Sequence, residues 1–315
     1  MKTITNAGPV KLTKGQRLGR DIWRSRELYM FLIPGLILTF IFMYIPMYGI
    51  QIAWKQLRLG EAVTAGKWIG WKNFTRFFKS IQFGDIMWNT IFLNLCLLFI
   101  NTPFAILLAL MMHNSSSKRI KSITQTTTYL PYMISMVIIV QLIDLFTNPS
   151  SGLINIVIKS MGGTAINFGY EEYFVGLYIV SAIWQSAGYT SILYLSALSA
   201  IDQSVVEAAR IDGASKAQRM WHIDFKLIIP TVATMMILNM GKIMTAASME
   251  KVLLMQTPVN LGASEIISTY VYQVGVVGSQ YGFGAAIGLF NSAVNILILL
   301  IANAVSKKVA KTSLF

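Results

Sequence analysis

The chain has 315 residues, of which 55% are hydrophobic and only 12% are charged. Because soluble domains carry about 25% charged residues, this composition is typical of a membrane protein. The net charge of +13 does not indicate nucleic-acid binding, since the basic residues stand mostly at the ends of apolar stretches, where they orient membrane spans. A single cysteine, Cys96, excludes an internal disulfide bond, and no metal-ligand spacing is present.

A polar and basic segment, residues 1–27, opens the chain. The positive-inside rule predicts that it is a cytoplasmic leader. The apolar run that follows is too long for the hydrophobic region of a signal peptide and has no small-residue cleavage site after it. We therefore interpret this run as a retained membrane span.

Six apolar stretches are long enough to cross about 30 Å of hydrocarbon at ~1.5 Å per residue. The expected spans are 28–52, 86–112, 123–146, 173–195, 227–248 and 283–305. Basic residues in the loop 113–122 and in the tail 306–315 indicate the cytoplasmic side. The loop 53–85 is expected outside by alternation, although it is also basic, and its aromatic residues indicate a segment at the membrane surface.

The predicted fold is therefore an all-α integral membrane protein with six transmembrane helices and both termini in the cytoplasm. We expect one six-span domain, 28–305, between the basic leader 1–27 and the basic tail 306–315. No hydrophilic stretch is long enough for a separate soluble domain, and the sequence has no evident internal repeat.

The charged, amphipathic segment 196–230 lies between the fourth and fifth expected spans. Ser204 and Glu207 have the S-x-x-E spacing of a capping box, which predicts a helix start. Asp212-Gly213 predicts the turn that ends this helix, because glycine readily adopts a positive φ. A second helix is expected to start at an S-x-x-Q box, Ser215–Gln218. The pattern predicts a cytoplasmic elbow of two short helices lying against the membrane.

The series EAARIDGA at 207–214, with Phe225 and Pro230 downstream, resembles the EAA motif of the membrane permeases of binding-protein-dependent ABC importers. Further stretches resemble the carbohydrate-uptake branch of that family and its oligosaccharide and polysaccharide subgroup. These stretches are IPMYGI (45–50), WIGWKNFTRFF (68–78), EKVLLMQTP (250–258), ISTYVYQVG (267–275) and AIGLFNSAVN (286–295).

This resemblance implies that the elbow is a coupling helix that fits a groove on a cytoplasmic ATPase subunit. The residues that it assigns to coupling are Glu207, Ala208, Ala209, Asp212, Gly213 and Ala214. The small side chains allow close approach, and the acidic side chain at 207 can pair with a basic group on the partner. It can also act only as part of the capping box, and the two roles do not exclude each other.

The resemblance also implies the partners: a second homologous permease, two ATPase subunits and an extracytoplasmic solute-binding protein. The chain has no G-x-x-x-x-G-K-[ST] motif with which to hold nucleotide phosphates, so ATP and Mg are expected in the ATPase partners. His113 and His222 are isolated in the sequence, and we expect no catalytic residues, no metal site and no cofactor bound by this chain.

Polar residues within the expected spans are candidates for the substrate path, because burying them in a membrane is costly. The candidates are Gln185, Tyr189, Tyr194, Asn239, Lys242, Asp144 and Asn291, with Asn94, Asn101, Gln141 and Asn295 as further polar positions. Hydrogen bonding between helices is the alternative role for each asparagine. Lys242 could pair with Asp144 or Glu250, or could favour an acidic sugar.

The sequence thus predicts a transmembrane subunit of an ATP-driven importer for an oligosaccharide or a polysaccharide-derived sugar. A secondary transporter or channel that works alone is the alternative. The absence of an internal repeat and the scarcity of acids inside the expected spans disfavour it. A membrane enzyme would need an acid–base or metal constellation, which the sequence does not indicate.

Overall fold

The structure, a computed structural model, describes residues 23–57 and 60–309. Most of the expected leader and tail lies outside these ranges. The chain divides into two units, residues 1–52 and 53–315, which are described separately.

The described part of the first unit is helical. It contains α2 (Arg26–Thr39), η1 (Phe40–Tyr44) and most of η2 (Ile45–Trp54). The helical stretch Arg26–Trp54 is long and apolar enough to cross a membrane, and none of the side chains in its most apolar window is buried. Its extent agrees with the first expected span.

The second unit begins with a small surface structure in place of an irregular loop. Strands β1 (Lys55–Gln56) and β2 (Lys67–Trp68) pair antiparallel, and α3 (Lys72–Phe78) follows. Trp54 stacks on Trp68 with ring centroids 6.3 Å apart. The Asn73 side-chain amide donates to the Ala53 carbonyl over 2.8 Å, which ties the helix to the hairpin.

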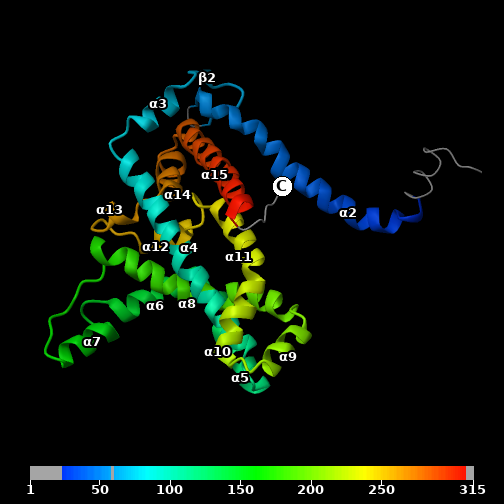
Figure 1. Cartoon of the computed structure of the whole chain (residues 1–315). Coiled ribbons are helices and arrows are strands. Elements are labelled where there is room, and N and C mark those ends of the chain that lie inside the picture. The colour runs from blue at the N-terminus through cyan, green and yellow to red at the C-terminus, as the bar shows by residue number, and fades with distance from the viewer. Residues whose placement is uncertain (1–22, 58–59, 310–315) are drawn as a thin grey trace, which may run out of the picture. The chain divides into compact units, whose positions relative to one another are not determined.

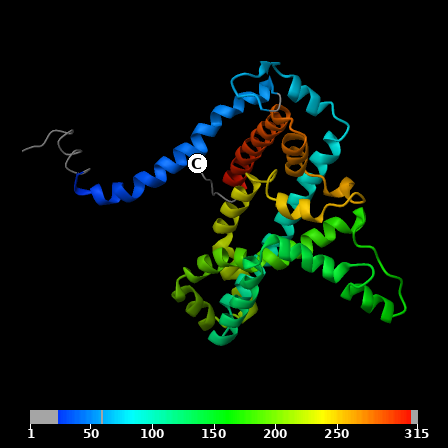
Figure 2. The ribbon, with the colours of Figure 1, turned by 180° about the vertical axis from the view of Figure 1, so that it is seen from behind.

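Long apolar helices make up the body of the second unit (Figures 1 and 2). They are α4 (Phe83–His113), α8 (Glu171–Ser199), α11 (Phe225–Met240) and α15 (Tyr281–Val309). α4 runs between α3 at one end of the unit and α5 at the other, and it packs along α8. Within the described residues, four helical stretches of the whole chain can each cross a membrane, or up to six if each of two bent pairs is one span.

The first bent pair corrects the third expected span, which we predicted as one helix over 123–146. Instead, α5 (Lys118–Tyr129) and η3 (Leu130–Met133) meet α6 (Met136–Thr147) at an angle of 99°. Ile134 and Ser135 are extended, so the helical hydrogen-bond ladder is interrupted there. The break follows closely on Pro131, whose ring cannot donate a backbone hydrogen bond.

The fifth expected span, 227–248, also needs correction. The helix starts earlier, continuing from α10 (Lys216–Arg219) and η4 (Met220–Asp224) into α11, and it ends at Met240. Turns follow at residues 241–245, so Lys242 lies after the helix and is exposed. The other bent pair joins α8 to α9 (Gln203–Ile211) at 74°.

Shorter helices complete the unit: α7 (Leu153–Ser160), α12 (Met249–Met255), α13 (Leu261–Ser264), α14 (Ile267–Val271) and η5 (Tyr272–Val277). Of the buried clusters, one joins three long helices near the elbow. Leu110 of α4, Leu198 of α8 and Ile228 of α11 belong to it, each at most 1% exposed. These helices therefore share a packed core between the elbow and the cavity described below.

Candidate functional site

The elbow begins at Asp202, which caps α9. Its carboxylate accepts the Ser204 backbone N–H over 2.9 Å, and this hydrogen bond lowers the pKa of the carboxyl. The predicted capping box of Ser204 and Glu207 is therefore wrong, because the helix starts at Gln203 and Ser204 is already inside it. Glu207 is exposed and is not needed to cap α9.

The turn at Gly213 has the predicted positive φ, +79°. The Ala214 N–H donates to the Ala209 carbonyl over 3.0 Å, and the Gly213 N–H donates to the Arg210 carbonyl over 3.1 Å. This pair of bonds is the Schellman arrangement that ends a helix at a glycine. The backbone itself therefore fixes the bend of the elbow.

The second helix of the elbow starts at the predicted capping box. The Ser215 hydroxyl accepts the Gln218 N–H over 3.3 Å, and the Gln218 side chain accepts the Ser215 N–H over 2.8 Å. This prediction is confirmed. The two capped helices meet at a fixed turn, as Figure 1 shows for α9 and α10.

The outer surface of the elbow presents most of the EAA residues. Glu207, Ala208, Asp212 and Gly213 are exposed, whereas Ala209 is buried and Ala214 is partly buried. Ile211, between them, is 87% exposed.

Polar contacts attach the elbow to the end of α4. Asp224, only 3% exposed, accepts a hydrogen bond from the Asn114 side-chain amide over 2.7 Å. The Lys216 ammonium donates to the Ser116 hydroxyl over 3.4 Å. A buried carboxylate that lost its partner would be costly, so the first of these contacts holds the elbow and α4 together.

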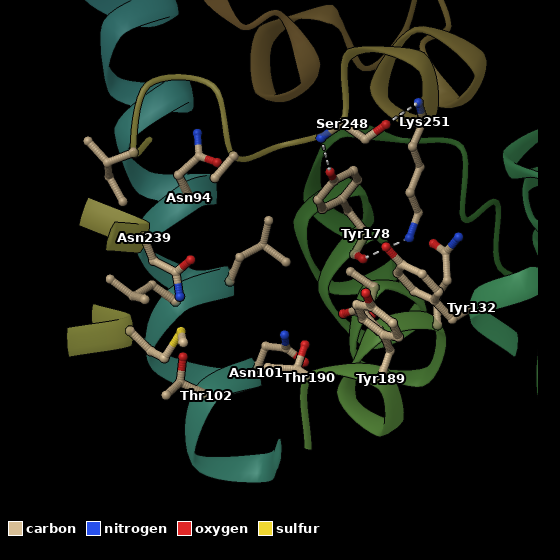
Figure 3. A pocket seen from close by; sticks show the side chains of 18 of the residues that line it. Asn94, Asn101, Thr102, Tyr132, Tyr178, Tyr189, Thr190, Asn239, Ser248 and Lys251 are labelled. Carbon is tan, nitrogen blue, oxygen red and sulfur yellow. Dashed lines mark hydrogen bonds between the residues drawn. The ribbon is translucent and has the colours of Figure 1, made fainter. Parts of the chain in front are cut away.

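A cavity of about 530 Å³ lies among α4, η3, α8, α11 and α12 (Figure 3). Its wall is formed by asparagine, threonine, serine and tyrosine side chains together with aliphatic ones. The polar lining residues are Asn94, Asn101, Thr102, Tyr132, Tyr178, Gln185, Ser186, Tyr189, Thr190, Tyr194, Asn239, Ser248 and Lys251. An apolar and aromatic wall with a few placed polar groups is the usual make-up of a ligand site.

Two tyrosines form an aromatic surface in this cavity. The rings of Tyr132 and Tyr189 are parallel within 1°, with centroids 4.0 Å apart. Gly188 lies against Thr128 so closely that a Cβ at this position would overlap the Thr128 carbonyl oxygen. The glycine therefore lets α5 approach α8 and brings the two rings together.

A buried lysine lies at another part of the wall. Lys251 of α12 is 1% exposed, and its Nζ lies 3.5 Å from the Tyr178 carbonyl oxygen and 4.8 Å from the centre of the Tyr178 ring. The Tyr178 hydroxyl accepts the Ser248 N–H over 3.0 Å. Figure 3 shows these three residues together, with the lysine side chain directed along the tyrosine.

Asparagines of α4 contribute polar atoms to the same cavity. The Asn94 side-chain amide donates to the Thr90 carbonyl over 2.6 Å, but its Oδ1 has no hydrogen-bond partner and the residue is 1% exposed. The Oδ1 of Asn101 is likewise buried without a partner. Since buried polar atoms are normally paired, these oxygens are available to a ligand or to water.

The cavity brings together four of the predicted substrate-path residues, namely Gln185, Tyr189, Tyr194 and Asn239. The other three do not line it. Lys242 is exposed in the turn after α11, Asp144 is exposed on α6, and Asn291 is buried on α15.

Sequence reasoning missed Lys251, Tyr178 and Tyr132 as parts of the wall. Lys251 falls in a stretch that was expected outside the membrane, where a lysine attracts no notice. The available signal was the apolar run that follows it, Val252, Leu253, Leu254 and Met255. Such a run indicates that a short helix here has a buried side. Among the described residues, no group of three or more His, Cys, Asp and Glu is placed to hold a metal ion.

Residues 101–311 match the family of inner membrane components of binding-protein-dependent transport systems. The chain belongs to this family. It is similar to the polygalacturonan/rhamnogalacturonan transport system permease protein YteP of Bacillus subtilis (strain 168), at 35% identity over 100% of both chains. Protein LplB of the same organism is 34% identical, over 95% of this chain and 92% of its own.

Two solved bacterial structures resemble this permease. One is an ABC transporter involved in the import of the acidic polysaccharide alginate, with a TM-score of 0.84, 36% identity, and coverage of 93% of this chain and 99% of that one. The other is an alginate ABC transporter in complex with an alginate pentasaccharide-bound periplasmic protein, with a TM-score of 0.85, 36% identity, and coverage of 95% and 100%. The chain is thus a multi-pass membrane permease with the helical fold of ABC importers.

Proposed function

We propose that this permease imports an oligosaccharide, or a sugar derived from a polysaccharide, across the cytoplasmic membrane, driven by ATP hydrolysis in partner subunits. It would cross the membrane six times with both termini in the cytoplasm. The named saccharide systems among its relatives support the substrate class. The cavity supports it as well, since hydroxyl and amide groups beside tyrosine rings suit a sugar's hydroxyls and its apolar faces.

One observation carries the proposal: the helices that form the cavity are also those that enter and leave the elbow. α8 contributes Gln185 and Tyr189 to the cavity and leads into α9, and α11 follows the elbow and contributes Asn239. The cluster around Leu198 and Ile228 is packed between the two sites. Because packed interiors transmit displacement and do not absorb it, a movement of the elbow would reach the cavity wall.

The mechanism follows from this arrangement. Two ATPase subunits, holding ATP and Mg, would close on each other and carry the elbow of this chain and that of a second, homologous permease. The long helices would then rock, so that the cavity faces first a solute-binding protein outside and then the cytoplasm. Glu207, Ala208, Asp212 and Gly213 are exposed at the position where the ATPase would dock. Shape would contribute most of the contact, since exposed ion pairs add little.

Reconstitution of the permease with its partner subunits in proteoliposomes tests this proposal. ATP should drive uptake of an oligosaccharide delivered by the binding protein, and an ion gradient without ATP should not. Glu207→Lys should leave the permease inserted but reduce co-purification of the ATPase. Uptake that continues without any ATPase and follows an ion gradient would instead support a secondary transporter.

A further inference from the structure

Lys251 is a buried cation without an anionic partner in the described part of the chain. Its Nζ donates a hydrogen bond to the Tyr178 carbonyl over 3.5 Å and lies over the Tyr178 ring. α12 lies outside the candidate spans, and burial lowers the pKa of the Lys251 ammonium to about 8, with no carboxylate acting against this shift. Buried charges in proteins are normally paired, because burying an unpaired ammonium is costly.

The position of this cation relates it to the cavity. Lys251 is part of the wall together with Tyr178, and the stacked rings of Tyr132 and Tyr189 lie on the same side in Figure 3. The figure shows Asn94 across the cavity from them, and its Oδ1 has no partner. The cavity thus offers a cation, an aromatic surface and a free acceptor.

We propose that Lys251 is a specificity-determining residue that binds the carboxylate of an acidic sugar unit, so that the permease favours anionic over neutral oligosaccharides. This inference rests on the proposed function and adds the charge of the substrate to it. The sugar carboxylate would be the anionic partner of the ammonium. The rings of Tyr132 and Tyr189 would contact the apolar face of the sugar, and the Asn94 Oδ1 would accept a hydrogen bond from a sugar hydroxyl. The similar ABC transporter involved in the import of the acidic polysaccharide alginate supports a negative charge on the substrate.

The cation that the sequence favoured for an acidic sugar, Lys242, does not offer this site. Lys242 is exposed and does not line the cavity. A structural role for Lys251, holding α12 against Tyr178, is the competing explanation. The two explanations predict different results. If Lys251 has only a structural role, its substitution reduces uptake of neutral and acidic substrates equally.

The test uses the complete importer, with its ATPases, second permease and binding protein, in proteoliposomes. Uptake of a galacturonate oligosaccharide is compared with uptake of a neutral galactose oligosaccharide of equal length, each at saturating binding protein. Lys251→Met should lower the acidic-to-neutral uptake ratio by roughly tenfold or more, as expected when one member of a buried charge pair is removed. Lys251→Arg, which keeps the charge, should retain most of the preference.

Lys159→Met is the matched control. Lys159 is exposed on α7, and its ammonium also donates to a backbone carbonyl, that of Pro149, over 3.4 Å. This variant should keep the wild-type ratio. If Lys251→Met does not assemble, Lys251→Gln removes the same charge while keeping a donor for the Tyr178 carbonyl.

The outcomes distinguish a failure of the role given to Lys251 from a failure of the proposed function. An unchanged acidic-to-neutral ratio in Lys251→Met or Lys251→Gln, or an equal loss of both substrates, overturns the role of Lys251. If the wild-type importer takes up neither oligosaccharide with ATP, the proposed function fails instead. A lowered ratio that Lys251→Arg restores supports the inference.

Discussion

The elbow and the cavity are carried by the same helices, yet they are built in different ways. In the elbow, the residues that fix the shape lie within a short stretch of chain, from Asp202 to Gln218, and bond to near neighbours. In the cavity, the lining residues run from Asn94 to Lys251 and meet only because long helices pack together.

This difference shows why one region can be recognised in a sequence and the other cannot. A glycine at positive φ and a capping box leave a local pattern, so the elbow has a motif. The cavity depends on which side of each helix faces inward and on breaks such as that at Ile134, which no short pattern specifies. The two regions should therefore respond differently to substitution.

The largest expected effect is at Gly213. Gly213→Pro cannot keep φ at +79° and removes the N–H that bonds to Arg210. Positive-φ strain costs about 1–3 kcal/mol, and each 1.4 kcal/mol is about tenfold in an equilibrium, so ATP-driven uptake should fall by roughly fivefold to 100-fold. ATPase co-purification should fall with it, whereas membrane insertion should not change.

The control for this prediction is Gly162→Pro. Gly162 has a φ of +85° and its N–H also bonds to a nearby carbonyl, that of Lys159, but it lies outside the elbow. Uptake near the wild-type level in this variant, with loss in Gly213→Pro, would locate the effect in the elbow. Equal losses in both variants would show that strain alone is responsible.

The next effect is expected in the cavity, at Gly188. In Gly188→Ala the new methyl overlaps the Thr128 carbonyl, so α5 must move from α8 and the Tyr132–Tyr189 stack should open. Overpacking typically costs about 1–3 kcal/mol. Uptake and the thermal unfolding temperature should both fall while ATPase co-purification persists, whereas in Gly213→Pro the co-purification falls together with uptake.

Gly176→Ala is the matched substitution in the same helix, because a Cβ there meets no atom within 4 Å. It should leave uptake and unfolding temperature near those of the wild type. If both glycine variants lose uptake equally, the close approach of α5 to α8 is not what shapes the cavity.

A smaller effect is expected where the elbow joins α4. Asn114→Ala leaves the buried Asp224 carboxylate without the donor now 2.7 Å away, at a cost of about 1–3 kcal/mol in unfolding free energy. Thermal unfolding in detergent measures this loss. Ser116→Ala, which loses only an exposed contact with Lys216, should unfold near the wild-type temperature, and a similar decrease in both variants would contradict the role given to Asn114.

The smallest effect concerns the start of α9. Asp202→Ala should lower the unfolding temperature slightly, and more than Ser204→Ala, because the carboxylate of Asp202 accepts a backbone N–H of the helix. A larger decrease in unfolding temperature in Ser204→Ala would contradict the Asp202 cap and would support the predicted capping box of Ser204 and Glu207.

Much of the fold follows from the sequence because apolar runs of sufficient length become helices wherever backbone groups must bond internally. The expected spans at 86–112, 173–195 and 283–305 match α4, α8 and α15 within a few residues. The break after Met133 and the end of α11 at Met240 were missed, since hydropathy continues through both.

The candidate site was predicted unevenly for a related reason. Tyr189 and Asn239 were found because polar residues within long apolar helices are conspicuous. Lys251 was missed because its burial depends on α12 folding back onto α8, a contact between residues distant in the sequence. The Gly213 turn and the Ser215 box were found because their bonds are local.

The central claim is that movement of the elbow changes access to the cavity. A single cysteine at Gln185, in a Cys96→Ser background, can report this through its labelling by a membrane-impermeant thiol reagent added outside vesicles that hold the whole importer. We predict that ATP with vanadate increases the labelling rate when the elbow is native and leaves it unchanged in Gly213→Pro. An equal increase in both would contradict the claim.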